Sequence, residues 1–156
     1  ILNTGRVRDQ WHTMTRTGKS VRLAGHRPEP MLEMHPVDAA LRGIAEGDIA
    51  EVTSAWGRGV LRVHLCDSLR PGEAFAPMHW TAQTSRSGRI NSAVNPAVDP
   101  ISGQPELKHT PVEIQRLDMR WHGTILARRP VMMPEVPYWA RIRGDGYHAY
   151  VVAGDQ

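Results

Sequence analysis

The stretch "EGDIAEVTSAWGRGVLRVHLCDSLRPGEAFAPMHW", residues 46–80, decides the fold class. Its strand-forming residues come in short runs between glycines: Ile49, Val52, Val60, Leu61, Val63 and Leu65. The Gly-Arg-Gly at 57–59 separates two runs and predicts a hairpin turn. The Arg-Pro-Gly at 70–72 predicts a second turn before a short strand at 74–77. We therefore predict a β-meander.

The flanking segments predict fewer helices than strands. "HPVDAALRGI", residues 35–44, predicts one helix, with Pro36 near its start and Asp38 able to cap it. Residues 81–110 are polar and rich in proline, which indicates a long loop, and residues 110–118 predict a closing strand. Residues 126–139 suggest a proline-rich crossover, and residues 141–154 a hairpin. A composition shift near 118–121 predicts two units, 1–118 and 119–156.

Composition limits the possible classes of protein. With 156 residues, 40% of them hydrophobic, the chain is long enough for a core and is not a disordered tail. No apolar run approaches the ~20 residues of a bilayer-spanning helix. The single cysteine, Cys66, excludes an internal disulfide framework and a four-cysteine cluster. The chain begins at Ile1 with no signal sequence, which suggests a fragment of a longer protein.

Several short motifs are too incomplete to predict a phosphate, metal or catalytic site. The Gly-Lys-Ser at 18–20 lacks the upstream glycine of a phosphate loop, because position 13 is Thr13. His64 and Cys66 lie two residues apart on a predicted strand, with no second pair of zinc ligands nearby. No Gly-x-Ser-x-Gly nucleophile motif occurs. We predict no metal site and no catalytic group within the chain.

The opening stretch "LNTGRVRDQWHTMTRTGKS", residues 2–20, contains more side chains that could bind a ligand. The first 30 residues hold six Lys or Arg against two acids, which favours an anionic partner. Gly5 permits a sharp turn or a close approach to the backbone, and the Arg6 guanidinium suits phosphate. Trp11 offers a stacking face beside His12 and Thr13. The pattern fits a flat, phosphorylated heterocycle, or equally a strand end with surface arginines.

The same residues resemble a known family. "TGRVRDQWHTMTR" is similar to the signature that opens the C-terminal cofactor domain of bis-molybdopterin guanine dinucleotide oxidoreductases, which include nitrate reductases, formate dehydrogenases and dimethyl sulfoxide reductase. The stretches "HPVDAALRGIAEGDIAEVTSAWGRGVLRVHL", "PGEAFAPMHW" and "RINSAVNPAVDPISGQPELKHTPVEI" extend the resemblance over residues 1–118. The last stretch and the Trp-His pair resemble assimilatory, cytoplasmic nitrate reductases most.

The resemblance implies a fold, and it implies which parts of the longer enzyme hold the cofactor, the metal ligand and the cluster. The expected fold is mainly β, a six-stranded double-psi β-barrel with short helices, as in aspartate decarboxylase and the fourth domain of formate dehydrogenase. The cofactor is bis-molybdopterin guanine dinucleotide. The molybdenum ligand and an iron–sulfur cluster belong to earlier domains, which are the chain's expected partners. The isolated fragment is expected to be inactive.

The resemblance also implies site residues. Thr4, Gly5 and Arg6 are expected to meet the dinucleotide, and Trp11, His12 and Thr13 the pterin side. Asn91 is expected to bind a pterin edge, and Lys108 a phosphate. Met78 is expected to line the substrate funnel, with His79 as a competing assignment. The remaining members of the continuous run are Val7, Arg8, Asp9 and Gln10, of which Asp9 departs from the basic pattern and is expected to pair with Arg8.

The implied activity of the parent enzyme is reduction of nitrate to nitrite in the cytoplasm, with an electron donor that the sequence does not reveal. Nucleic-acid and membrane partners are not expected. A formate dehydrogenase or another enzyme of the family is the first alternative. A stand-alone double-psi barrel that serves as a binding module is the second.

Overall fold

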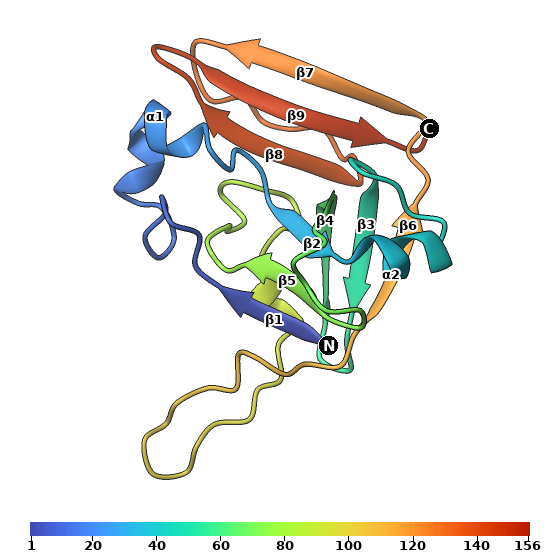
Figure 1. Cartoon of the computed structure of the whole chain (residues 1–156). Coiled ribbons are helices and arrows are strands. Elements are labelled where there is room, and N and C mark those ends of the chain that lie inside the picture. The colour runs from blue at the N-terminus through green and yellow to red at the C-terminus, as the bar shows by residue number, and fades with distance from the viewer.

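The computed structural model describes residues 1–156 and contains two β-sheets with few helices (Figure 1). The larger sheet has six strands in the order β1-β5-β2-β4-β3-β6, and the smaller has the order β7-β9-β8. The strands are β1 (Leu2–Gly5), β2 (Met31–Met34), β3 (Ile49–Thr53), β4 (Arg58–Leu65), β5 (Ala74–Pro77), β6 (Glu113–Leu117), β7 (Trp121–Ala127), β8 (Tyr138–Arg143) and β9 (His148–Gly154). The helices are η1 (Thr17–Lys19), α1 (Val21–Ala24), α2 (Pro36–Leu41) and η2 (Ile90–Ser92). The chain is therefore mainly β, as expected.

The predicted meander is right for two of its three strands. β3 and β4 form the expected antiparallel hairpin, but its turn lies at residues 54–57 and not at 57–59, because Arg58 and Gly59 already belong to β4 and Arg58 pairs with Thr53. β5 does not continue it, because β4 already has β3 on one edge and β2 on the other. Instead β5 lies between β1, which it pairs in parallel, and β2, which it pairs antiparallel. Strand patterning identifies β5 as a strand but not the edge that it joins.

Helix α2 is confirmed, but its cap differs from the prediction. His35 is the N-cap residue, and its Nδ1 accepts a hydrogen bond from the Val37 amide at 3.1 Å. Pro36 occupies the first turn, where its missing N–H costs nothing. Asp38 instead accepts from the Gly72 amide at 2.6 Å and so ties the helix to the turn before β5.

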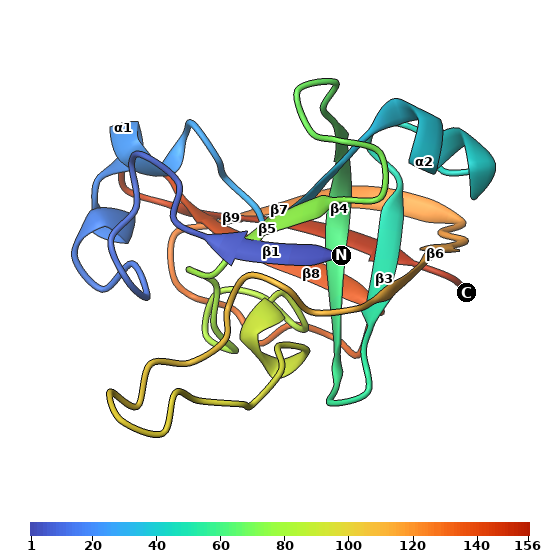
Figure 2. The ribbon, with the colours of Figure 1, turned by 60° about the horizontal axis from the view of Figure 1, so that its bottom comes forward.

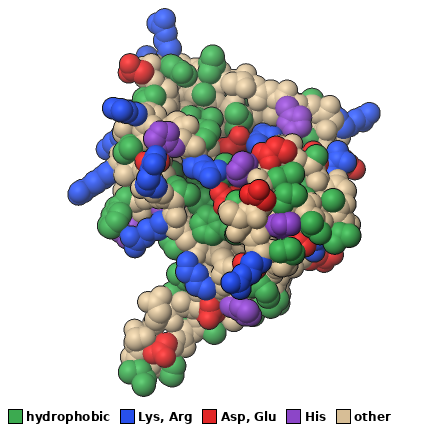
Figure 3. Space-filling model, viewed as in Figure 1, with side chains coloured by type: hydrophobic (Ala, Val, Ile, Leu, Met, Phe, Trp, Pro, Cys, Tyr) green, Lys and Arg blue, Asp and Glu red, His purple; other side chains and the backbone are tan.

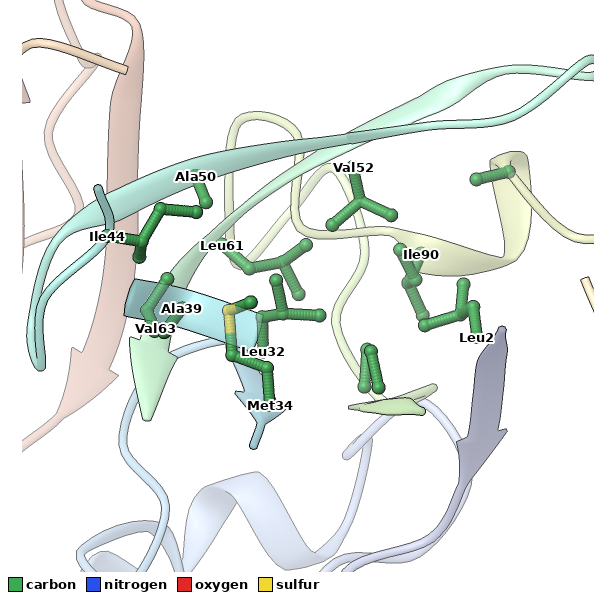
Figure 4. Close-up of a cluster of buried hydrophobic side chains, with 13 residues drawn as sticks. Leu2, Leu32, Met34, Ala39, Ile44, Ala50, Val52, Leu61, Val63 and Ile90 are labelled. Carbon is green, nitrogen blue, oxygen red and sulfur yellow. The ribbon is translucent and has the colours of Figure 1, made fainter. Parts of the chain in front are cut away.

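The main core lies within the larger sheet (Figure 4). Leu2 of β1, Leu32 of β2 and Leu61 of β4 are completely buried, and Ile90 of η2 packs against the same cluster. Burial of such side chains is worth about 1.5–3 kcal/mol each. This core holds β1 and β5 side by side and so positions the loops that follow them.

The smaller sheet packs against the larger one through a second cluster. Ile49 and Val60 come from the large sheet, and Tyr138, Ala140 and Ala153 from the small one. The predicted hairpin is confirmed, with Arg143 opposite His148 next to its turn. The predicted crossover, residues 126–139, is right only for its middle part: residues 128–137 form neither helix nor strand, but its two ends belong to β7 and β8. The small sheet covers one side of the molecule in Figure 1.

None of the helices approaches the length that a bilayer span requires, since the longest, α2, has six residues. No three His, Cys, Asp or Glu side chains lie close enough together to hold a metal ion.

Candidate functional site

The site begins where β1 and β5 end. The two strands are parallel, so Gly5 and Pro77 lie opposite each other where both strands end. This end of the sheet is called the β1–β5 edge, or the β1 edge, below. The pairing continues beyond the strands, because the Met78 amide donates to the Gly5 carbonyl at 3.0 Å. The segments after β1 and β5 therefore leave the sheet together. In Figure 2 the segment after β1 and the long loop that precedes β6 extend toward the same side of the molecule.

Lys108 joins this edge from the far end of that loop. Its ammonium donates to the Thr4 carbonyl at 2.6 Å, and the Thr4 hydroxyl donates to the Leu107 carbonyl at 2.9 Å. Residues 104 positions apart are thus brought together. A methyl group at position 5 would lie 2.9 Å from Phe75 Cε2 and 3.4 Å from Lys108 Nζ. Gly5 is therefore needed for close packing, and not for a left-handed turn.

His79 fixes the segment after β1. Its completely buried ring accepts from the Val7 amide through Nε2 at 3.0 Å. Nδ1 lies 2.6 Å from the His12 carbonyl, which can only accept, so the proton is on Nδ1 and the ring is neutral. Burial lowers the pKa of His79 from its ordinary value, and the Arg6 charge acts in the same direction.

The sequence offered His79 only as a rival to Met78 for the substrate funnel, and this bridging role was missed. A histidine that serves two backbone groups makes no local pattern. The signal available was its position directly after the strand that pairs with the signature segment.

Four of the predicted residues present free side chains at this edge. Arg6, Trp11, His12 and Thr13 are exposed, and their side chains make no hydrogen bond within the chain. The Arg6 guanidinium lies 4.7 Å from the centre of the Trp11 ring, a cation–π arrangement. Trp11 also meets the His12 ring edge to face. The group offers a cation and two flat rings to solvent.

Other members of the run are used internally. Arg8 pairs with Asp9 at 3.1 Å, as expected, and Asp9 also meets His26 at 2.7 Å. Hydrogen bonds from Arg8 and then His26 lower the pKa of Asp9. Gln10 is buried and accepts from the Thr17 hydroxyl at 2.7 Å, which closes the loop. Val7 contributes its amide to His79, as described above.

Asn91 lies on η2 with an exposed side chain that makes no hydrogen bond within the chain. The Ser92 hydroxyl donates to the Arg58 carbonyl at 2.8 Å, which ties η2 to the β3–β4 hairpin. The Asn95 amide donates to Thr110, and Thr110 pairs with Leu2 at the base of β1. No hydrogen bond joins the Asn91 side chain to the residues after β1.

The surface around the edge is basic. Lys and Arg side chains gather over the segment after β1 and α1, along the left side of Figure 3. Those in the segment are Arg6, Arg8, Arg16, Lys19, Arg22 and Arg27. Arg8 and Arg27 have carboxylate partners, and the other four make no ion pair. Cations, a flat ring and unpaired donors beside a sheet edge are the features of a β domain that binds an anionic, ring-bearing ligand.

The chain belongs to the family described as "Molydopterin dinucleotide binding domain", the molybdopterin dinucleotide-binding domains, whose model matches residues 1–111. It is 45% identical to a nitrate reductase of Klebsiella oxytoca over 99% of this chain and 18% of that protein. It is 32% identical to the F420-dependent formate dehydrogenase subunit alpha of Methanocaldococcus jannaschii over 75% of this chain and 17% of that protein. The chain thus spans less than a fifth of these relatives' length.

A solved structure has the same fold. Acetylene hydratase from Pelobacter acetylenicus matches with a TM-score of 0.63 and 20% sequence identity, over 75% of this chain and 18% of that one. The likeness concerns the fold alone, over three quarters of this chain. The Klebsiella alignment includes the small sheet as well, because it covers nearly the whole chain.

Proposed function

We propose that the chain is the cofactor-binding domain of a molybdenum nitrate reductase and that it holds bis-molybdopterin guanine dinucleotide for the reduction of nitrate to nitrite. The observation that carries the proposal is the 45% identity to a nitrate reductase over 99% of the chain. The identity extends beyond the family match at residues 1–111 and so includes the small sheet.

The donors at the β1–β5 edge fit such a cofactor. Arg6 and Lys108 place cations beside the end of β1, where phosphate groups would bind. Trp11 and His12 offer ring faces and Thr13 a hydroxyl for the pterin side. The free amide of Asn91 can donate and accept at once, as a pterin edge requires. The bound molybdenum group would supply the two-electron chemistry.

The other residues of the run act as its scaffold in this proposal. Thr4 fixes Lys108 through its carbonyl, and Gly5 leaves the space in which Phe75 and Lys108 pack beside the end of β1. Val7 and Gln10 hold the loop, and Arg8–Asp9 neutralises part of its charge. Met78 lies beside this edge and is our candidate for the substrate funnel. No residue of the chain is assigned a catalytic role.

We also propose that the large sheet closes as a six-stranded double-psi barrel. The support is the segment from Leu107 to Leu117, which borders both ends of the sheet. The Thr4 amide donates to Leu107 and Thr110 pairs with Leu2 on the free edge of β1. The same segment then becomes β6, which pairs with β3 at the other end. Residues 119–156 form a separate C-terminal extension in this scheme.

The proposed partners are the other domains of the same enzyme, the substrate nitrate and an electron donor that remains unassigned. The cytoplasmic location implied by the resemblance stays a prediction. No nucleic-acid or membrane partner is proposed.

The test is made in the parent enzyme. Arg6→Ala and Asn91→Ala should each lower the molybdenum and guanine content of the purified protein, because each removes a donor that the chain leaves free for the cofactor. Arg70→Ala is the control, since Arg70 is exposed, makes no ion pair and lies before β5 rather than after it. Wild-type metal and guanine content in both variants would count against the site.

Formate oxidation is the second candidate, favoured by the 32% identity to a formate dehydrogenase subunit. Both enzymes would hold the same cofactor, so the binding experiment does not separate them. Two assays of the parent enzyme separate the candidates: nitrate with reduced viologen, and formate with oxidised viologen. The isolated chain should be inactive in both.

A further inference from the structure

A cavity of about 290 Å³ lies between the loop that contains η1 and the small sheet, and Gln10 and Thr13 of the proposed cofactor run stand on its rim. The loop contributes Lys19 and Arg27, and the segment after β5 contributes Trp80 and Thr84. The small sheet contributes its hairpin end: Arg141, Ile142, Arg143 and His148. Three stretches far apart in the sequence thus enclose one space, and part of it lies outside the family match at residues 1–111.

The lining is cationic and contains no acid. Of its four Lys and Arg residues, only Arg27 has a carboxylate partner, Glu33 at 2.9 Å. Lys19, Arg141 and Arg143 make no ion pair and no side-chain hydrogen bond. Arg141 and Arg143 lie two apart on β8 and therefore point to the same side of the strand. Two guanidinium groups without partners in one hollow repel each other unless an anion separates them.

An independent observation comes from His148, which lies opposite Arg143 on β9. Its Nδ1 is buried and has no hydrogen-bond partner, the one such side-chain atom in the structure. Buried polar atoms without partners are rare, and each one calls for an explanation such as a bound ligand. Burial lowers the pKa of His148, and the charges of Arg141 and Arg143 add to this.

We propose that this cavity binds a phosphate-bearing small molecule, with Arg141, Arg143 and Lys19 on the phosphate oxygens and His148 Nδ1 as a further polar contact. Planar guanidinium groups match phosphate geometry, and lysine adds a point charge. The volume is near the lower limit of small-molecule sites, about 300 Å³, and exceeds the needs of a lone nitrate ion.

The cavity shares Gln10 and Thr13 with the proposed cofactor surface and adds Lys19, Arg141, Arg143 and His148, to which the proposed function gives no role. Two sources could supply the phosphate: a free phosphorylated metabolite or the dinucleotide end of the cofactor itself. The chemistry of recognition is the same for both, and the experiment separates them. Failure here leaves the Arg6 and Asn91 tests untouched, because Arg141 and Arg143 belong to neither.

The experiment titrates the 156-residue chain with inorganic pyrophosphate, guanosine diphosphate and, as a carboxylate probe, succinate, by calorimetry. Both phosphate probes should bind and succinate should not. Arg141→Gln should weaken pyrophosphate binding by about tenfold or more, as expected for one lost charge-assisted hydrogen bond. The Arg141 side chain makes no hydrogen bond or ion pair within the chain, so this substitution should leave the fold intact, which circular dichroism checks.

Arg70→Gln is the matched control, an identical loss of charge at an exposed position outside the cavity, and should bind like the wild type. The His148 ring signals should shift with pyrophosphate in the wild type and in Arg70→Gln. In the parent enzyme, Arg141→Gln lowers guanine content if the cofactor is the source and leaves it unchanged if a free metabolite is. Absence of binding, equal weakening by both substitutions, or equally tight succinate binding would overturn the proposal.

Discussion

Replacement of His79 tests the contacts that hold the segment after β1. The change His79→Leu removes two hydrogen bonds and leaves a side chain of similar bulk in a completely buried position. The Val7 amide, 3.0 Å from Nε2, and the His12 carbonyl, 2.6 Å from Nδ1, both lose their partners. Arg6 and Trp11 lie within or beside this bridged segment, so their placement depends on it.

The expected loss of stability follows from the Val7 amide and the His12 carbonyl, which both lose their partner. A buried backbone group left without a partner costs about 1–3 kcal/mol. Two such groups would cost up to twice that, but the segment is partly open to water, which can replace some of the bonding. We expect the free energy of unfolding to fall by about 2–4 kcal/mol. The free energy of unfolding of the His79→Asn variant should fall by about half as much, because the Asn side-chain nitrogen can still donate to the His12 carbonyl.

Urea unfolding followed by circular dichroism measures the change. His122→Leu is the control, since the His122 side chain is exposed on β7 and makes no hydrogen bond. If the His79 variants unfold at the same urea concentration as the wild type and the control, the two contacts do not stabilise the fold and the argument fails.

The same bridge predicts a pH dependence. The pKa of His79 is lower in the folded chain than its ordinary value of 6.5, because burial disfavours the charged ring. The unfolded chain therefore takes up this proton first as the pH falls. Stability should be greatest above pH 6.5 and should decline below it, down to the folded pKa. His79→Leu should remove this part of the decline, which urea titrations at a series of pH values would measure.

Two further changes test the packing beneath the site. Gly5→Ala places a methyl group 2.9 Å from Phe75 Cε2 and should cost about 1–3 kcal/mol in urea unfolding; an unchanged midpoint would mean that the ring yields freely. Tyr138→Phe removes the hydrogen bond to Glu29 at 2.6 Å but keeps the 2.9 Å Arg62–Glu29 pair. It should cost about 1.5–3 kcal/mol, as a bond to a charged acceptor does, and a thermal midpoint equal to that of the wild type would contradict this.

Local patterns in the sequence predicted most of the strands but not their neighbours. The β3–β4 hairpin and the β8–β9 hairpin follow from alternating residues and glycine turns, which act over a few residues. The position of β5 depends on which strand edges are already occupied, and that is decided by the whole sheet. The cap of α2 was misassigned for a similar reason, since Asp38 has a partner 34 residues away.

The candidate site was predicted mainly through the resemblance. Spacing alone could not bring Lys108 to Thr4, because 104 residues separate them. The physical reading of the opening stretch did identify Arg6, Trp11, His12 and Thr13 as free donors and rings, which the structure leaves exposed. It could not distinguish them from Gln10, whose polar side chain is buried against Thr17.

The small sheet bears directly on the loops of the site. The Tyr138 hydroxyl holds Glu29, in the segment that returns from η1 and α1 to β2. The Arg141 amide donates to Thr84, and the Arg86 amide donates to Trp139, so β8 also holds the segment between β5 and η2. One strand therefore restrains the return path of the Arg6–Thr13 loop and the approach to Asn91. Residues 119–156 thus stabilise both halves of the proposed cofactor surface through β8.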